Sequence, residues 1–186
     1  RYYAVTGVQT CALPISHDHT KTGVHDLCGN IWEVLAGLRI KNGVLMVAAN
    51  NDAALPETDL TQCGDDWKLL TDDKGAPVYV SASGSEIVFT TDNDEAGGLG
   101  SCEWGKVKTE CKSEMLKEYA LFSGEKEAYC CIDATEGEYI PLRGGRWLDG
   151  GSAGVFNLYL SSPRSNSWAL YGGRSAFFKK KQKAER

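Results

Sequence analysis

The chain has 186 residues, of which 25 are acidic and 20 basic, and 42% of them are hydrophobic. This composition predicts one folded domain with a core of its own and excludes disorder across the whole chain. A net charge of −5 argues against general binding to nucleic acid or anionic lipid. No apolar run approaches the roughly 20 residues of a membrane-spanning helix.

The N-terminal segment 1–16 does not read as natural protein. Val5 to Ile15, with Ser16 at the join, resembles the translation of a common sequencing-library adapter. We therefore treat 1–16 as a non-native segment, leave it out of the fold prediction, and expect the natural chain to extend further upstream. One alternative is a genuine edge strand. The other is a signal peptide, but the lone Arg1 and the absence of a sustained apolar run do not favour it.

The cysteines beyond this segment are scattered rather than grouped. They show no Cys-x-x-Cys spacing and the histidines all lie near the join, so the sequence does not predict a zinc site. Scattered thiols in an acidic chain are typical of small buried hydrophobic residues. The cysteines are Cys28, Cys63, Cys102, Cys111, Cys130 and Cys131, and the histidines are His17, His19 and His25.

Short apolar runs predict antiparallel strands in the first half of the chain. Asp26 to Leu38 reads as a buried strand. The Asn42-Gly43 pair between two apolar runs predicts a tight hairpin, because both turn residues tolerate a positive φ. A second hairpin is predicted from 77–81 and 86–90, and a polar loop at 50–66 separates the two.

One helix is predicted after the second hairpin. Within Lys108 to Phe122, Cys111, Met115 and Tyr119 recur every four residues, which would place them on one face of a helix. Thr109 would cap its start. The stripe is typical of a core face rather than of a cofactor site. The predicted fold class is therefore α+β, with short antiparallel strands and long loops.

The glycine-rich segment 142–177 carries the clearest pattern. Alternation along Val155 to Ser161 predicts a strand with one core face and one exposed face. Glycines on both sides of this strand allow tight turns, so the segment could hold exposed side chains on a fixed backbone. The core face is formed by Phe156, Leu158 and Leu160, and the exposed face by Val155, Asn157, Tyr159 and Ser161.

Two sets of motifs give the chain a family resemblance. Gly-Gly-x-Trp at 144–147, Ala-Gly-Val-Phe-x-Leu-x-Leu at 153–160 and Gly-x-Arg-Ser-Ala at 172–176 are similar to the variable region of proteins diversified by diversity-generating retroelements. Upstream, Gly-Asn-Ile-Trp-Glu at 29–33 resembles the Gly-Asn-Val-Trp-Glu-Trp motif of the formylglycine-generating-enzyme branch of the C-type lectin fold. The variable proteins diversified by these retroelements belong to the same branch of the fold. The resemblance implies a C-type-lectin-like domain over 17–178, followed by a basic disordered tail at 179–186.

The resemblance also implies which residues contact a ligand. In that family, adenine-rich codons, usually for Asn, mutate to codons for Tyr, Ser, Asp, Leu or Ala, and this chain shows that mixture within 142–177. Tyr, Trp, Ser and Gly together are typical of adaptable binding surfaces. The implied contacts are Leu148, Asp149, Ser152, Tyr159, Ser161, Ser162, Trp168, Ala169, Leu170 and Tyr171. The implied scaffold is formed by Trp32, Trp147, Phe156, Leu158 and Leu160.

The function implied is non-catalytic binding to a protein or glycan on a target cell surface. Such a protein would be displayed on a phage tail or on a bacterial cell surface, and a homo-oligomer such as a fibre trimer is left open. The alternative is an oxidoreductase like the formylglycine-generating enzyme, the sulfatase-modifying factor. Its copper chemistry needs two thiolates near the C-terminal region, whereas no cysteine follows Cys131.

We expect neither catalytic residues nor a resident cofactor. The iron-dependent sulfoxide synthases of this fold use clustered histidines, and His17-Asp18-His19 lies too close to the join to suggest one. Calcium is left open, because the runs at 50–52 and 92–95 are rich in oxygen ligands. Neither run has the loop spacing of an EF-hand.

Overall fold

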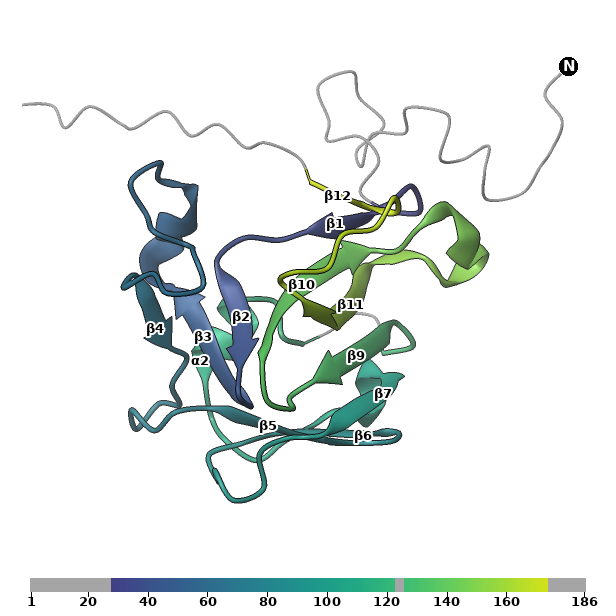
Figure 1. Ribbon diagram of the computed structural model, residues 1–186. Helices are drawn as coiled ribbons and strands as arrows, with labels where there is room; N and C mark the ends of the chain where they lie inside the picture. The colour runs from purple at the N-terminus through teal and green to yellow at the C-terminus, as the bar shows by residue number, and fades with distance from the viewer. Residues whose placement is uncertain (1–27, 123–125, 174–186) are drawn as a thin grey trace, which may run out of the picture.

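The computed structural model describes residues 28–122 and 126–173 (Figure 1). The adapter-like segment 1–16, the three histidines and the basic tail at 179–186 lie outside the described residues. The described chain is mainly β-sheet, with one short α-helix, α2 (Glu114–Glu118). No helix among these residues is long and apolar enough to cross a membrane.

Short strands dominate both halves of the described chain. They are β1 (Trp32–Val34), β2 (Leu38–Lys41), β3 (Val44–Ala48), β4 (Trp67–Leu69), β5 (Tyr79–Ser83), β6 (Glu86–Thr90), β7 (Leu99–Glu103), β8 (Lys108–Thr109), β9 (Tyr129–Asp133), β10 (Glu138–Gly144), β11 (Gly154–Pro163) and β12 (Tyr171–Gly172). Three 3-10 helices join them, η1 (Ala49–Ala54), η2 (Trp104–Lys106) and η3 (Trp147–Ser152).

The strands form one sheet in the order β7-β9-β11-β10-β2-β3-β5-β6-β8. One edge of β5 bonds to the residues just before β3 and just before β7: Val80 N donates to Gly43 O at 2.9 Å and Ala82 N donates to Gly97 O at 2.8 Å. The path of the sheet therefore closes on itself. Gly98 permits this close approach, since a Cβ there would lie 1.9 Å from the Ala82 carbonyl oxygen.

Both predicted hairpins are confirmed. Asn42 and Gly43 take φ values of 50° and 79° between β2 and β3, as the tight turn requires. The β5–β6 hairpin has a shorter turn than predicted, with Gly84 at φ 58°. The predicted strand at 26–38 is much shorter in the structure: of its described residues, 28–38, β1 and the first residue of β2 are strand.

The predicted helix over Lys108 to Phe122 is wrong for most of its length. Lys108 and Thr109 pair with β6 as β8, and Glu110 N donates to Phe89 O at 2.9 Å. Thr109 is thus a strand residue rather than a helix cap. Strand pairing overrides the local helical spacing here, and the four-residue repeat reflects burial against the core instead.

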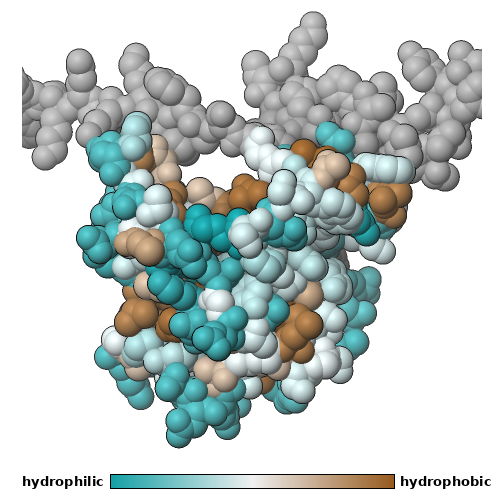
Figure 2. Space-filling view, viewed as in Figure 1, coloured by the Kyte–Doolittle hydropathy of each residue, from teal (hydrophilic) through white to brown (hydrophobic). Residues whose placement is uncertain are grey.

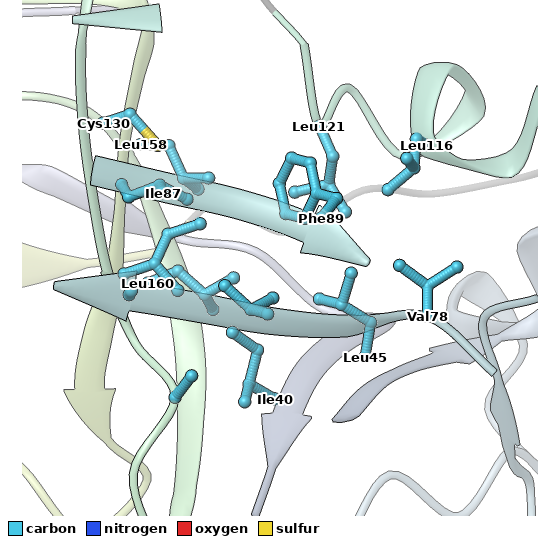
Figure 3. Close-up of a cluster of buried hydrophobic side chains, with 14 of the residues drawn as sticks. Ile40, Leu45, Val78, Ile87, Phe89, Leu116, Leu121, Cys130, Leu158 and Leu160 are labelled. Carbon is cyan, nitrogen blue, oxygen red and sulfur yellow. The ribbon is translucent and has the colours of Figure 1, made fainter. Parts of the chain in front are cut away.

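The main core is a cluster of buried side chains drawn from β2, β3, β5, β6, β7, β9 and β11 (Figure 3). Leu158 and Leu160 of β11 meet Ile87 of β6, while Leu116 and Leu121 cover Phe89 (Figure 3). Cys102, Cys111, Cys130 and Cys131 are buried, which confirms the prediction for these four thiols, whereas Cys28 and Cys63 are exposed. Burial raises the pKa of Cys102, Cys111 and Cys130, so they act as small apolar side chains.

Two residues assigned to the scaffold are exposed instead. Phe156 and Trp147 are each 41% exposed. For Phe156 the cause is a bulge: Arg143 pairs with Leu158, but the next residue, Gly144, pairs with Gly154. The extra residues of β11 break the alternation, so the core face begins at Leu158 rather than at Phe156. Trp32, Leu158 and Leu160 are buried, as predicted.

A buried ion network anchors the other end of β11. Glu138 accepts from Arg39 Nη1 at 2.8 Å and from Arg164 Nε at 2.7 Å, and the Arg39 guanidinium lies 4.2 Å from the Trp67 ring centroid. Burial alone would raise the pKa of the Glu138 carboxyl. Hydrogen bonds from the two arginines and their charges outweigh burial, so its pKa lies below the ordinary value.

Candidate functional site

A wide groove lies on the outward face of the sheet, beside β9 and β11. Its volume is about 1170 Å³. The strands supply its floor, η3 one wall, and the segment before β12 another. Its lining residues are Trp32, Glu103, Glu127, Ala128, Tyr129, Arg146, Asp149, Ser152, Ala153, Gly154, Val155, Phe156, Asn157, Tyr159, Trp168 and Tyr171. Aromatic rings and a few charged groups thus face one concave surface, as in many ligand sites.

Strands β1, β10 and β12 bring the two sequence motifs together at this groove. β1 pairs with both β10 and β12, so Glu33 lies opposite Arg143, and Trp32 lies opposite Tyr171. The two strands β1 and β12 run side by side across one end of the molecule (Figure 1). The motif at 29–33 is therefore a neighbour of the segment 142–177 in space.

Half of the predicted contact residues line the groove. These are Asp149, Ser152, Tyr159, Trp168 and Tyr171, which come from η3, β11, the following loop and β12. Leu148 and Ala169 are exposed but do not line it. Figure 2 shows apolar side chains over the end of the molecule where η3 lies, and Leu148 there is 54% exposed.

The remaining three predicted contacts are buried to different degrees. Leu170 is half-buried and its carbonyl accepts from Trp32 N at 2.9 Å. Ser161 is half-buried, with its hydroxyl 3.4 Å from the Cys131 sulfur. Ser162 is only 2% exposed, so its prediction as a surface contact is wrong. Ser162 shares the inward face of β11 with Leu158 and Leu160, two and four residues earlier.

The aromatic side chains form a corner at one end of the groove. The Trp32 and Tyr159 ring centroids lie 5.8 Å apart, and Trp168 and Tyr171 meet edge to face at 5.4 Å. Such ring pairs hold one another in place. The Arg146 guanidinium lies 4.8 Å from the Trp168 ring centroid, within range of a cation–π contact. The corner therefore presents fixed aromatic surfaces.

Arg146 is a groove residue that the sequence-based prediction missed. Asp149 accepts from Arg146 N and from Arg146 Nε, both at 2.9 Å, and so caps the start of η3. An acid three residues after a basic residue, just beyond a Gly-Gly pair, was the available signal for this capping pair. Asp149 thus positions Arg146 as well as lining the groove.

Glu103, Glu127, Tyr129 and Phe156 were also missed as groove residues. The first three lie outside 142–177, and only the register of β7 and β9 brings them to β11. Burial, followed by the neighbouring Cys131 thiol, raises the pKa of Tyr129 to about 12, so its hydroxyl stays protonated at neutral pH. The groove therefore offers a phenol and carboxylates in addition to the aromatic corner.

Backbone bonds fix the bulged part of β11 beneath these side chains. The Phe156 carbonyl accepts from Trp104 Nε1 at 2.9 Å and from Arg143 Nη1 at 3.2 Å. The buried Asn157 side chain accepts from Tyr129 N at 2.9 Å and donates to the Ser152 carbonyl. These bonds tie β11 to β9 and to η3, so the floor and one wall of the groove are held together.

The described residues do not form a site with obvious metal ligands. Across 28–122 and 126–173, no three His, Cys, Asp or Glu side chains gather where they could hold an ion. In the acidic run at 92–95, Asp92 Oδ1 accepts from Asp94 N at 2.9 Å within a local turn. Asp52 uses its carbonyl for Leu55 N and the Thr58 hydroxyl.

Comparison of the chain with models of known protein families and with curated proteins gives no match.

Proposed function

We propose that this chain is a non-catalytic binding protein whose groove recognises a receptor on a target cell surface. The observation that carries this proposal is the gathering of Asp149, Ser152, Tyr159, Trp168 and Tyr171 around one concave surface. They come from η3, β11, the following loop and β12, and each was inferred as a contact from sequence alone. Large aromatic side chains beside small polar ones give contact area at little entropic cost.

The pairing of the two motifs supports a C-type-lectin-like fold of the formylglycine-generating-enzyme branch. β1, with Trp32 and Glu33, is bonded to β10 and β12 of the region proposed to vary. The motif thus forms part of the platform for the variable segment. In this proposal the protein is displayed on a phage tail or on a bacterial cell surface, and Tyr159 and Trp168 change with its receptor.

Two tryptophans of similar exposure make a matched test of the binding surface. Trp168 lines the groove and is 46% exposed, whereas Trp147 is 41% exposed and does not line it. The purified chain would be screened against arrays of bacterial surface proteins and glycans. For any ligand bound, we expect Trp168→Ala to weaken binding by about 1 to 3 kcal/mol and Trp147→Ala to change it little.

Equal losses in the two variants, with both still folded, would contradict the assignment of the groove. The proposed diversification has its own test in the neighbouring DNA. We expect a reverse-transcriptase gene and a near-copy of the coding segment for 142–177 that differs only at adenines. A neighbouring sulfatase gene without such a copy would favour the oxidoreductase instead.

A further inference from the structure

The end of the groove formed by the last residue of β7 and the start of β9 is acidic. Glu103 on β7 lies directly across from Tyr129 on β9, and Glu127 lies two residues before Tyr129. Tyr129 and Phe156 beside them are 40% and 41% exposed. Two carboxylates and two partly exposed rings therefore share this end.

The charges of the groove are only partly balanced within the chain. The single guanidinium of the lining, Arg146, is paired with Asp149. Glu103 meets Lys106 at 3.3 Å, but the side chains are 52% and 62% exposed, and such exposed pairs exchange readily with other partners. No cation within the described part of the chain forms an ion pair with Glu127. The acidic end thus has negative charge left for a ligand.

We propose that this acidic end binds a lysine or arginine side chain of a protein ligand. The cationic head would meet Glu103 and Glu127, and the apolar stem would pack on Tyr129 and Phe156. A groove of about 1170 Å³ has room for the flanking residues of an extended segment. Glu127, which has no ion pair within the described residues, and Glu103, whose pair with Lys106 is exposed, favour a basic protein segment over a neutral glycan. This inference depends on the groove being the binding site proposed above.

Short peptides that differ in one side chain test the charge preference. The probes are the pentapeptide acetyl-Ala-Leu-Lys-Leu-Ala-amide, its central Gln and Glu counterparts, and chitotriose as a neutral glycan. Each is titrated into the ¹⁵N-labelled full chain and followed by NMR. We expect the Lys peptide to shift signals of Glu103, Glu127 and Tyr129 and to bind about 3- to 10-fold more tightly than the Gln peptide. Raising NaCl from about 50 to about 500 mM should remove most of this preference.

A pair of charge-neutralising variants locates the effect. Glu127→Gln should reduce the preference for Lys over Gln by about two- to five-fold. Glu118→Gln, which removes an exposed acid of α2 outside the groove, should leave the preference for the Lys peptide unchanged. Glu127 is exposed, so neither variant is expected to unfold the domain.

Three outcomes would overturn the inference. The Lys peptide could bind no more tightly than the Gln peptide, Glu127→Gln could leave the preference intact, or no peptide could shift the groove signals. If chitotriose or the Gln peptide occupies the groove equally well, the proposed binding function stands and only the basic-ligand assignment fails. If Trp168→Ala and Trp147→Ala are equivalent towards an array ligand, the groove itself is the wrong site.

Discussion

The two ends of strand β11 differ in burial and regularity. From Leu158 onward the strand alternates regularly, buries its leucines in the core, and ends beside the Glu138 ion network. Before Leu158 the strand bulges, and Val155 and Phe156 turn outward into the groove. One strand thus joins a stability region to a candidate binding region. The bulge, rather than a change in composition, marks the boundary between them.

The largest effect that we expect on stability comes from the buried end. Leu158→Ala should lower the free energy of unfolding by about 3 to 5 kcal/mol, because it leaves a cavity in a fully buried site. Urea denaturation of the wild-type and variant chains measures this change. A loss under about 1 kcal/mol would mean that the core does not close over β11 as described.

The ion network should give the next largest effect. Glu138→Gln removes the charge that two arginines share, and Arg39 stays buried with its charge unpaired. We expect a loss of about 2 to 3 kcal/mol in the free energy of unfolding. Lys117→Gln, which breaks an exposed ion pair with Glu114, is the control and should cost under about 0.5 kcal/mol.

Asn157 lies at the boundary and tests the bulge itself. Asn157→Ala leaves Tyr129 N without its acceptor and removes the donor to the Ser152 carbonyl, and the Asn157 side chain that makes both bonds is buried. The expected cost is about 1 to 3 kcal/mol in the free energy of unfolding. Thermal unfolding measures this change, and an unchanged midpoint temperature would show that the bulge does not depend on the Asn157 side chain.

The pH dependence of stability follows from the lowered pKa of Glu138. A carboxyl with a folded-state pKa below its unfolded value of 4.5 stabilises the fold above pH 4.5, and this contribution disappears as the pH falls through the folded-state pKa. The wild type should therefore lose stability in acid below pH 4.5. Glu138→Gln should show a shallower loss over the same range, measured by urea denaturation at a series of pH values.

The smallest change in stability is expected at the exposed end. Phe156→Ala should alter the free energy of unfolding by less than about 1 kcal/mol, because the ring is 41% exposed and only its backbone carbonyl is tied down. Alanine at position 156 has the same backbone carbonyl, so the bond from Trp104 remains. A cost near that of Leu158→Ala would show that the alternation continues through Phe156 and that the bulge is absent.

Local sequence signals predicted the elements that depend on local geometry. The Asn42-Gly43 turn needs a positive φ at both residues, so the hairpin could be located from sequence. The helix over 108–122 could not be excluded, because its spacing fits a helix and only pairing with β6 decides otherwise. Phe156 was misplaced for a related reason: a bulge is defined by the partner strand, and period-two alternation carries no trace of it.

The candidate site was predictable only where it lies within one segment. The family pattern in 142–177 pointed to Tyr159 and Trp168, and both line the groove. Glu103 and Glu127 carry no pattern of their own, and they join the groove through strand pairing between distant parts of the chain. Ser162 was assigned from codon composition, which contains no information on the face of the strand.

The main-chain carbonyls around the groove are held by bonds that do not depend on the side chains of their own residues. The carbonyls of Phe156, Trp168 and Leu170 are all occupied, by Trp104, Tyr171 and Trp32 respectively. Every amino acid except proline has both a backbone N–H and a carbonyl, so these bonds remain when a side chain is substituted. Successive substitutions could therefore change the side chains of the contact surface while the backbone keeps its course and the chain still folds.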